Sequence, residues 1–262
     1  MPTRMPALFV SHGAPTLPFE NNASRAFLSE LGRTLARPRA ILVVSAHWQT
    51  RAPRVTTIAR PETIHDFYGF PQSLYDVRYP APGAPVLAET VIGLLNTRDF
   101  QARADGTRGL DHGAWSPLML MFPAADIPTI QLSLQLGQGP HHHFALGRAL
   151  APLREQGVLI LASGGAVHNL AVWQKDCTAV PAPARRFESW LVDQVEGNNR
   201  EALLQFRTHP DAAWAHPTDE HLLPLFVAMG AGGQGQTHHR AFLHNGLAMT
   251  AFAFTEPGTG FR

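Results

Sequence analysis

Histidine is the residue type through which this chain can do chemistry, because 14 of its 262 residues are histidines, against one cysteine and three tyrosines. His12, His47 and His168 each follow a short apolar run that is typical of a strand buried in a sheet. The three apolar runs are residues 7–10, 41–44 and 158–162. Ligands of open α/β sheets bind beyond the carboxyl ends of the strands. If these strands are parallel neighbours, the three histidines converge on one pocket, and such a cluster predicts a metal.

Two further histidines complete the set of candidate ligands: His112 in a glycine-flanked loop, and His221 near the start of the last predicted helix. Neutral imidazole suits zinc, iron and copper, and an open site of about three protein ligands leaves positions for a substrate. For each histidine alone, a structural role in a hydrogen bond is the alternative. No closely spaced ligand pair such as H-E-x-x-H is present. The metal is therefore a prediction from the whole set.

Other histidines are expected to be structural or solvated. His141, His142 and His143 open a predicted helix, and adjacent residues there point in different directions. We expect this trio to form a solvated helix start. His238 and His239 lie beside a glycine-rich stretch, residues 230–236, that is expected to be a surface loop, and we expect the same of them.

Composition excludes several classes of function. The chain is 45% hydrophobic and 16% charged, as expected of a globular protein with a large core. Its formal net charge is +1 and its basic residues are scattered, so no surface for nucleic acid or anionic membranes is indicated. The lone Cys177, expected to be an idle thiol, excludes an internal disulfide and a thiolate-built zinc site. No apolar stretch approaches the ~20 residues that span a bilayer, and no signal-peptide region is apparent, so we expect a cytoplasmic protein.

The elements that must position the histidines alternate between strands and helices. Strands are predicted at residues 7–10, 40–46, 128–134, 157–162 and 247–254. Helices are predicted at residues 22–36, 84–95, 115–121, 143–154, 185–206 and 219–229, the first capped by Asn22 and the last by Thr218. This alternation predicts an α/β fold, a single domain over residues 1–262 with a largely parallel central sheet flanked by helices.

Residues 49–82 form a long irregular segment that is rich in aromatics and proline. A loop of this length inside a compact domain is usually functional. The segment could form a stiff wall over a pocket that binds a flat ligand. A rigid surface loop without a functional role is the alternative.

Seven sequence blocks, in order along the chain, resemble one known family. They are SHGAP (11–15), VSAHW (44–48), TIHDF (63–67), YPAPG (79–83), LDHG (110–113), ASGGAVHNL (162–170) and EHLLP (220–224). Together they resemble the DODA-type (4,5-DOPA) extradiol dioxygenases of the class III extradiol, LigB-like superfamily. The resemblance extends from about residue 5 to residue 255. It implies the LigB-like fold and an enzyme that opens the ring of a catechol with O2 to give a muconic semialdehyde.

The resemblance implies metal ligation by His12, His47 and His221. Non-haem Fe(II) oxygenases commonly use two histidines and one carboxylate, and the third ligand of this branch is histidine in place of a carboxylate. Glu220 is adjacent to His221, and a register error of one residue would make it the ligand instead. On a helix the two side chains point about 100° apart, so only one of them can face a fixed metal. We favour His221.

The resemblance also implies the catalytic residues. His168 would be a further ligand when zinc occupies the site, or a catalytic base beside the metal. A metal-bound catechol loses its protons more readily because the cation stabilises the catecholate, and a histidine suits that proton transfer near neutral pH. His112 would be a second acid/base histidine, and His65 a substrate contact.

The implied cofactor is Fe(II) for activity, with Zn(II) expected as the bound metal of a purified sample because zinc binds imidazole sites tightly. The partners would be a small-molecule catechol and O2, with no nucleic acid or membrane, and the oligomeric state is left open. Arg51 or Arg78 is a candidate to pair the carboxylate of an acidic substrate. Two alternatives remain: a zinc-dependent hydrolase, since three histidines and a water also form a hydrolytic site, and a non-catalytic binding protein of the same fold.

Overall fold

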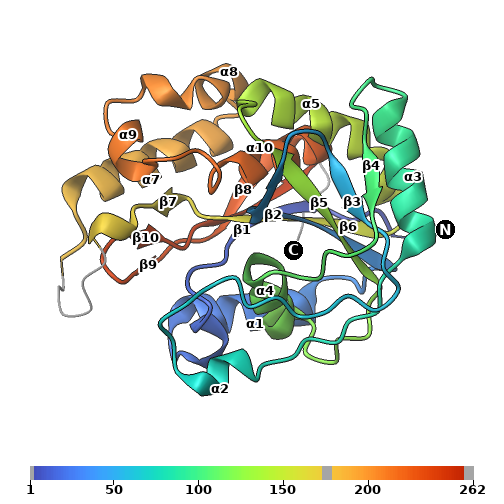
Figure 1. Ribbon diagram of the computed structural model, residues 1–262. Helices are drawn as coiled ribbons and strands as arrows, with labels where there is room; N and C mark the ends of the chain where they lie inside the picture. The colour runs from blue at the N-terminus through green and yellow to red at the C-terminus, as the bar shows by residue number, and fades with distance from the viewer. Residues whose placement is uncertain (1–2, 173–178, 257–262) are drawn as a thin grey trace.

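A computed structural model of the chain describes residues 3–172 and 179–256, and an eight-stranded sheet runs through its centre (Figure 1). In spatial order its strands are β4 (Arg103–Asp105), β3 (Arg54–Thr56), β5 (Thr129–Gln135), β2 (Ala40–Thr50), β6 (Val158–Gly164), β1 (Ala7–Ser11), β11 (Ala251–Thr255) and β8 (Gln234–His239). The four central strands, β5, β2, β6 and β1, are parallel, whereas the β3–β5, β1–β11 and β11–β8 pairs are antiparallel. The expected α/β fold with a largely parallel central sheet is confirmed.

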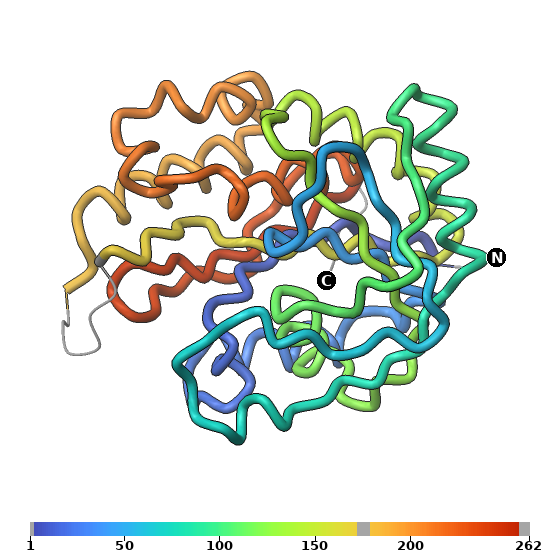
Figure 2. The backbone as a smooth tube through the Cα atoms, in the orientation of Figure 1, coloured from blue at the N-terminus to red at the C-terminus, as the bar shows by residue number. Residues whose placement is uncertain are grey.

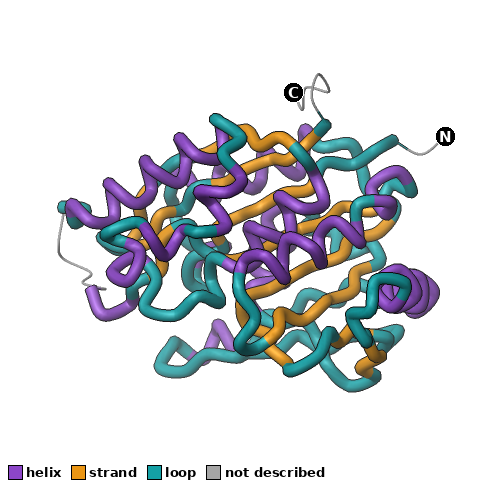
Figure 3. Tube along the Cα trace, turned by 90° about the horizontal axis from the view of Figure 1, so that it is seen from above, coloured by secondary structure: helices purple, strands orange, loops and turns teal. Residues whose placement is uncertain are grey.

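Helices cover both faces of this sheet (Figure 1), and Figure 3 looks down on one of these faces, where helices lie across the strands. Within β1, Ala7 and Phe9 pack into one buried cluster while Leu8 and Val10 pack into the other, because successive side chains of a strand point to opposite faces. On the Phe9 side lie α3 (Pro85–Asn96), α5 (Pro140–Leu150), α6 (Pro152–Glu155), α7 (Ala182–Glu196), α8 (Arg200–Leu204), η3 (Phe206–Thr208), α9 (Ala212–Ala215) and α10 (Leu223–Gly232). On the Leu8 side lie η1 (Leu17–Phe19), α1 (Ala23–Thr34), α2 (Gln72–Tyr75) and α4 (His112–Met121). In the part of the chain that the structure describes, no helix is long and apolar enough to cross a membrane.

A small antiparallel sheet stands beyond the end of the large one. It contains β7 (Val167–His168), β10 (Leu247–Ala248) and β9 (Phe242–Leu243), in that order. The predicted strand 247–254 is therefore two strands, one in each sheet. A short helix, η2 (Leu170–Val172), follows β7, and Cys177 lies outside the described residues. After the end of β2, the segment 49–82 contains only β3 and α2 as helices or strands, and most of it runs along the lower part of the molecule in the view of Figure 2.

Strand β2 is longer than expected, and His47 lies within it instead of beyond its end. The pairing of β2 with β5 passes from Val44 opposite Leu132 to Gln49 opposite Leu134, so β2 bulges where His47 stands. A bulge bends a strand and redirects its side chains, which is typical of strands beside functional sites. The sequence did not predict the bulge because the apolar run ends at Val44, and the polar residues that follow it are typical of a loop.

Helix α4 begins at His112 rather than at residue 115, because Asp111 caps it by accepting from the backbone N–H of Ala114 at 3.2 Å. The buried Asp111 carboxylate also accepts from the Ser45 hydroxyl at 2.7 Å and from Arg108 at 3.0 Å. Arg108 donates as well to the carbonyl of His47 at 3.0 Å. The start of α4 is thereby fastened to the bulge of β2.

Two other predicted helices have different limits. The helix expected at 185–206 is interrupted at residues 197–199, where Asn198 has a positive φ of 52°. The last helix, α10, begins at Leu223 and not at residue 219, and the side chain of Thr218 donates to Glu220 instead of capping it. The Asn22 cap of α1 is confirmed.

The glycine-rich stretch is not a surface loop. Gly230 and Gly232 belong to α10, and β8 begins two residues later. His238 and His239 are half-buried in β8, where His239 contacts the Ser24 hydroxyl at 3.0 Å and stacks on Phe27. The expectation that these two histidines are solvated is wrong.

His143 is fully buried, although a solvated helix start was expected there. Its Nε2 accepts from the backbone N–H of Gln135 at 3.2 Å, and its Nδ1 donates to the carbonyl of Gly139 at 3.0 Å. His142 donates to the Gln135 side chain at 3.0 Å, while His141 is exposed. Burial lowers the pKa of His143 from 6.5 to about 4.

We predict that His143→Gln makes the stability of the protein less dependent on pH in acid. The folded-state pKa of His143 lies below its unfolded value, so the unfolded chain takes up a proton first as the pH falls from 6.5 towards 4, and stability is lost over that window. This contribution is about 3 kcal/mol at most, since one pKa unit corresponds to about 1.36 kcal/mol. Urea unfolding at several pH values measures it, with His141→Gln as the matched control. Equal slopes for wild type and His143→Gln would contradict the assignment.

Candidate metal centre

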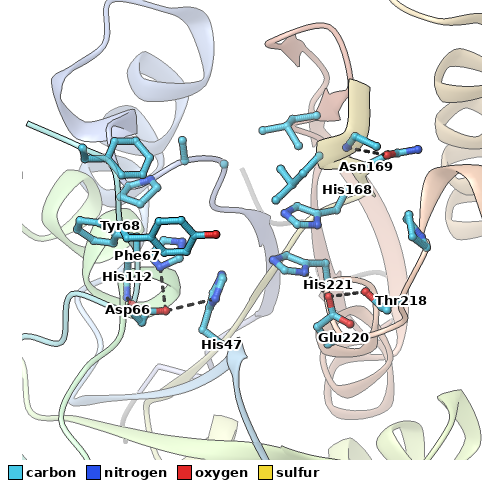
Figure 4. Close-up of a pocket in the computed structure, with 18 residues that line it drawn as sticks. His47, Asp66, Phe67, Tyr68, His112, His168, Asn169, Thr218, Glu220 and His221 are labelled. Carbon is cyan, nitrogen blue, oxygen red and sulfur yellow. Dashed lines mark hydrogen bonds and ion pairs between the residues drawn. The ribbon is translucent and has the colours of Figure 1, made fainter. Parts of the chain in front are cut away.

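Five histidines that are far apart in the sequence meet beyond the carboxyl ends of the parallel strands, and four of them, all but His12, are labelled in Figure 4. His12 follows β1, His47 lies in β2, His112 opens α4, His168 lies in β7 and His221 lies in the turn before α10. In Figure 4, His47 and His112 stand on one side of a cavity, and His168 and His221 stand on the other. The structure thus brings together the predicted metal-binding and catalytic histidines.

Glycines allow this close approach. A Cβ atom on Gly164, the last residue of β6, would lie 2.1 Å from the carbonyl oxygen of His221. The N–H of Gly165 donates to that same carbonyl at 2.8 Å. A Cβ atom on Gly113 would lie 2.3 Å from the Ser45 hydroxyl. The turn that carries His221 and the start of α4 can reach the strand ends only because these positions lack a side chain.

His12, His47 and His221 form a group whose potential ligand atoms all lie within 4.8 Å of one another. Nε2 of His12 and Nε2 of His47 are 3.0 Å apart. Metal–nitrogen bonds of about 2.0–2.1 Å place ligand nitrogens roughly 3–4 Å apart, so this spacing fits one small cation.

The proton of His12 can be assigned from its neighbours. The Ser163 hydroxyl donates its single proton to the carbonyl of Gly113, so the hydroxyl oxygen accepts from Nδ1 of His12 at 2.9 Å. His12 therefore carries its proton on Nδ1, and its Nε2 presents a lone pair to His47. A lone pair in that position is what a metal ion requires.

Glu220 does the same for His221. The carboxylate accepts from Nδ1 of His221 at 2.9 Å, so the ring proton lies on Nδ1 and Nε2 is unprotonated. That Nε2 is buried and has no hydrogen-bond partner among the described residues. A buried polar atom without a partner is costly unless something else satisfies it. The residues present therefore fit a metal ion, with Glu220 as the partner of His221.

Burial keeps these imidazoles neutral. It lowers the pKa of His12 and of His221 well below the usual 6.5, and the neighbouring histidines lower both further. The pKa of His47 falls to about 4, mainly through burial and then through His112, although two nearby carboxylates oppose the shift. Neutral imidazole is the form that binds metals.

A cavity of about 780 Å³ opens above this group. Phe67, Tyr68 and Phe70 of the 49–82 segment line it, so this segment does form a wall of the pocket. Phe67 and Tyr68 stand on the side of His112 (Figure 4). The size is within the range of small-molecule sites, roughly 300–1,000 Å³.

His168 and His112 lie at this cavity beside the three-histidine group. The ring of His168 stacks on that of His221 with 3.4 Å between centroids, and burial lowers the pKa of His168 to about 4. His168, Glu220 and His221 form a second group that could hold a metal. His112 bonds to Asp66, whose pKa falls to about 2 because the bonds from His112 outweigh the opposing effect of burial.

His65 is not among the residues that line the cavity. Its Nε2 donates to the carbonyl of Val77 at 3.1 Å, and its ring packs edge-to-face against the ring of Phe67, with 5.8 Å between centroids. Arg51 and Arg78 do not line the cavity either, and Arg78 donates to backbone carbonyls of its own segment. Neither arginine therefore lies where it could pair the carboxylate of a substrate in this cavity.

Reasoning from the sequence missed Ser163 and Asp66, which contact the histidine rings, and considered Glu220 only as a ligand. It also missed Asp111, which joins the start of α4 to β2. Ser163 had a usable signal, because it is a polar residue at the end of an apolar strand. Asp66 and Asp111 each neighbour a histidine in sequence, but the histidine that Asp66 holds is 46 residues away.

Comparison with known proteins identifies the family. Residues 6–255 match the family model described as the catalytic LigB subunit of aromatic ring-opening dioxygenase. The chain belongs to the LigB family.

Curated relatives of this LigB-family chain carry the name 4,5-DOPA dioxygenase extradiol. The protein from Escherichia coli (strain K12) is 43% identical over 87% of this chain and 86% of its own length. Those from Beta vulgaris and Portulaca grandiflora are 44% and 42% identical, over 86% and 95% of both chains. A crystal structure of an uncharacterized protein from Escherichia coli K12 shares the fold, with a TM-score of 0.80, 34% identity and coverage of 96% of this chain and 100% of that chain. Both the expected fold and the DODA-type resemblance are confirmed.

We predict that Ser163→Ala weakens zinc binding by about tenfold or more, because the loss of a ligand's hydrogen-bond partner typically costs 10–100-fold in metal affinity. The change removes the oxygen that holds Nδ1 of His12. Competition with a chromophoric chelator measures the affinity. Ser116→Ala is the matched control, because the Ser116 hydroxyl is also buried but has no hydrogen-bond partner among the described residues. Equal affinity in both variants would contradict the role of Ser163.

Proposed function

We propose that this LigB-family protein is a metal-dependent extradiol dioxygenase that opens the ring of a catechol, a DOPA-like 3,4-dihydroxyphenyl compound, with both atoms of O2 to give a muconic semialdehyde. One observation carries the proposal: three neutral histidines form a group that could hold a metal, and two of them, His47 and His221, line a cavity together with two more histidines. The names of the relatives support the same reaction.

His12, His47 and His221 would hold the metal, which we propose to be Fe(II) in the active enzyme. Fe(II) supplies a cation that favours deprotonated catechol oxygens and a redox centre for O2, whereas zinc would bind the same imidazoles without redox chemistry. Neutral ligands do not offset the charge of the cation, which favours a dianionic substrate.

The other residues bind the ring and move protons. His168 is neutral at pH 7 because burial lowers its pKa, so it can accept a proton from a catechol hydroxyl. His112 stands across the cavity and, once protonated, would supply a proton as the O–O bond breaks, with both oxygen atoms kept in the product. Phe67, Tyr68 and Phe70 offer apolar faces for a flat ring. His65 acts indirectly in this proposal, by packing behind Phe67.

We predict that a sample loaded anaerobically with Fe(II) consumes O2 when it is given L-DOPA or simple catechols, and forms a yellow semialdehyde with the mass of the substrate plus two oxygen atoms. A zinc-loaded sample is the control and should consume none. An oxygen electrode, absorbance and mass spectrometry provide the measurements. Ester or amide turnover with zinc would instead favour a hydrolase, and a fully metal-loaded protein that is inert towards every catechol would favour a binding protein.

We further predict that His168→Gln and His112→Gln each lower kcat by about 10²–10⁴-fold, the usual contribution of a general acid or base. Metal content and zinc affinity should stay close to those of the wild type, because neither residue belongs to the group of His12, His47 and His221. Loss of metal from His168→Gln would show instead that His168 is a ligand. His65→Gln is the control for the aromatic wall and should change KM more than kcat.

A further inference from the structure

Asp66 lies in the wall segment of the cavity and touches two of the histidines at once (Figure 4). One carboxylate oxygen, Oδ1, accepts from the backbone N–H of His112 at 2.9 Å. The other, Oδ2, lies 3.0 Å from Nδ1 of His112 and 3.3 Å from Nδ1 of His47. The side chain of Asp66 is 18% exposed, so these contacts are largely shielded from water.

The backbone around Asp66 is held in place by the start of α4. The N–H of Ile64 donates to the carbonyl of Leu110 at 2.7 Å, and the indole N–H of Trp115 donates to the carbonyl of Ile64 at 2.9 Å. Trp115 is itself fully buried. The position of the carboxylate relative to His112 is thus set by main-chain contacts as well as by its own bonds.

These contacts fix where the ring protons lie. A carboxylate only accepts hydrogen bonds, so the nitrogen of His112 that faces Asp66 must be the donor, and Nδ1 carries the proton. Nδ1 of His47 lies 3.3 Å from the same oxygen, a longer contact than the hydrogen bond to His112, and the carboxylate favours a proton on that nitrogen as well. Nε2 of His47 then carries a lone pair on the side of His12, 3.0 Å away.

We propose that Asp66 is the positioning residue that holds both His47 and His112 in the tautomer with the proton on Nδ1, so that each ring turns its Nε2 away from the carboxylate and towards the cavity. One oxygen atom thereby sets the orientation of a metal ligand and of an acid/base residue together, and the two rings stand 3.9 Å apart between centroids. The part that concerns His112 rests on the proposed function, whereas the part that concerns His47 requires only a metal site.

Asp66→Asn tests this proposal because it keeps the shape of the side chain but replaces an acceptor by a donor. The amide can still accept from the N–H of His112, but its NH₂ group now faces the ring nitrogens. His112 should change to the tautomer with the proton on Nε2. Long-range ¹⁵N–¹H NMR spectra of the zinc-loaded protein distinguish the two tautomers, and loss of folding alone does not produce a switch between them.

Two further measurements belong to the same test. Zinc affinity should fall by about 10–100-fold, as is usual when the partner of a ligating histidine is lost. In the Fe(II)-loaded enzyme, kcat for catechol should fall more than KM rises. Asp76→Asn is the matched control, because Asp76 is an exposed aspartate of the same segment, and it should leave all three values unchanged. If Asp66→Asn does not fold, Asp66→Ala removes the carboxylate without adding a donor and should show the same loss of zinc affinity.

The inference is wrong if Asp66→Asn retains the wild-type tautomers of both histidines, or if a folded Asp66 variant binds zinc as tightly as the wild type. Its failure can be told apart from failure of the proposed function. A wild type that cleaves no catechol, combined with the expected changes in tautomer and zinc affinity, would refute the dioxygenase and support the positioning of His47 by Asp66.

Discussion

The structure depends on the close approach of two ring nitrogens, Nε2 of His12 and Nε2 of His47, at 3.0 Å. Ser163 fixes the proton of His12 on the far side of its ring, so Nε2 of His12 turns a lone pair towards His47. Burial favours the neutral form of both rings and lowers the pKa of each. With the proton of His47 on Nδ1, as we propose, a cation between the two rings would bind both lone pairs. Nε2 of His221, which has no hydrogen-bond partner among the described residues, would complete its ligands.

The strand order explains how this arrangement is built. Strand β6 lies between β1 and β2, so Ser163 at its end stands beside the strands that lead to both His12 and His47. After Ser163, Gly164 leaves room for the turn that carries His221, and the backbone N–H of Gly165 donates to the carbonyl of His221. The ends of the central parallel strands thus carry His12, His47 and the Ser163 that orients His12. The aromatic wall of the cavity comes from the segment 49–82. This is the usual division in α/β folds, in which loops at strand ends supply the chemistry.

The sequence predicts well what local pattern determines. Apolar runs predicted the central strands, and the histidines that follow them, His12, His47 and His168, lie close together because the carboxyl ends of parallel strands meet. His221, which lies in a turn, was predicted as a ligand only from the family resemblance. Patterns could not give the bulge of β2 around His47, since it depends on Asp111 and Arg108 binding it from another element. Sequence patterns also could not show that His143 is buried. A helix start is usually solvated, and the contact of His143 with the backbone of Gln135 is known only from the structure.

The same limit applies to the carboxylates, and it bears on the chemistry. Asp66 and Glu220 both lie beside the histidine group, yet their oxygens face Nδ1 of His47, His112 and His221. Their negative charge therefore acts through the rings, whereas many non-haem iron enzymes place a carboxylate on the metal itself. In the proposed enzyme, such an arrangement would keep the ligands neutral and leave the charge of the cation to the substrate. A catechol that must lose two protons to bind through both oxygens is the kind of molecule that this charge would favour, which connects the hydrogen bonds behind the histidines with the choice of substrate in front of them.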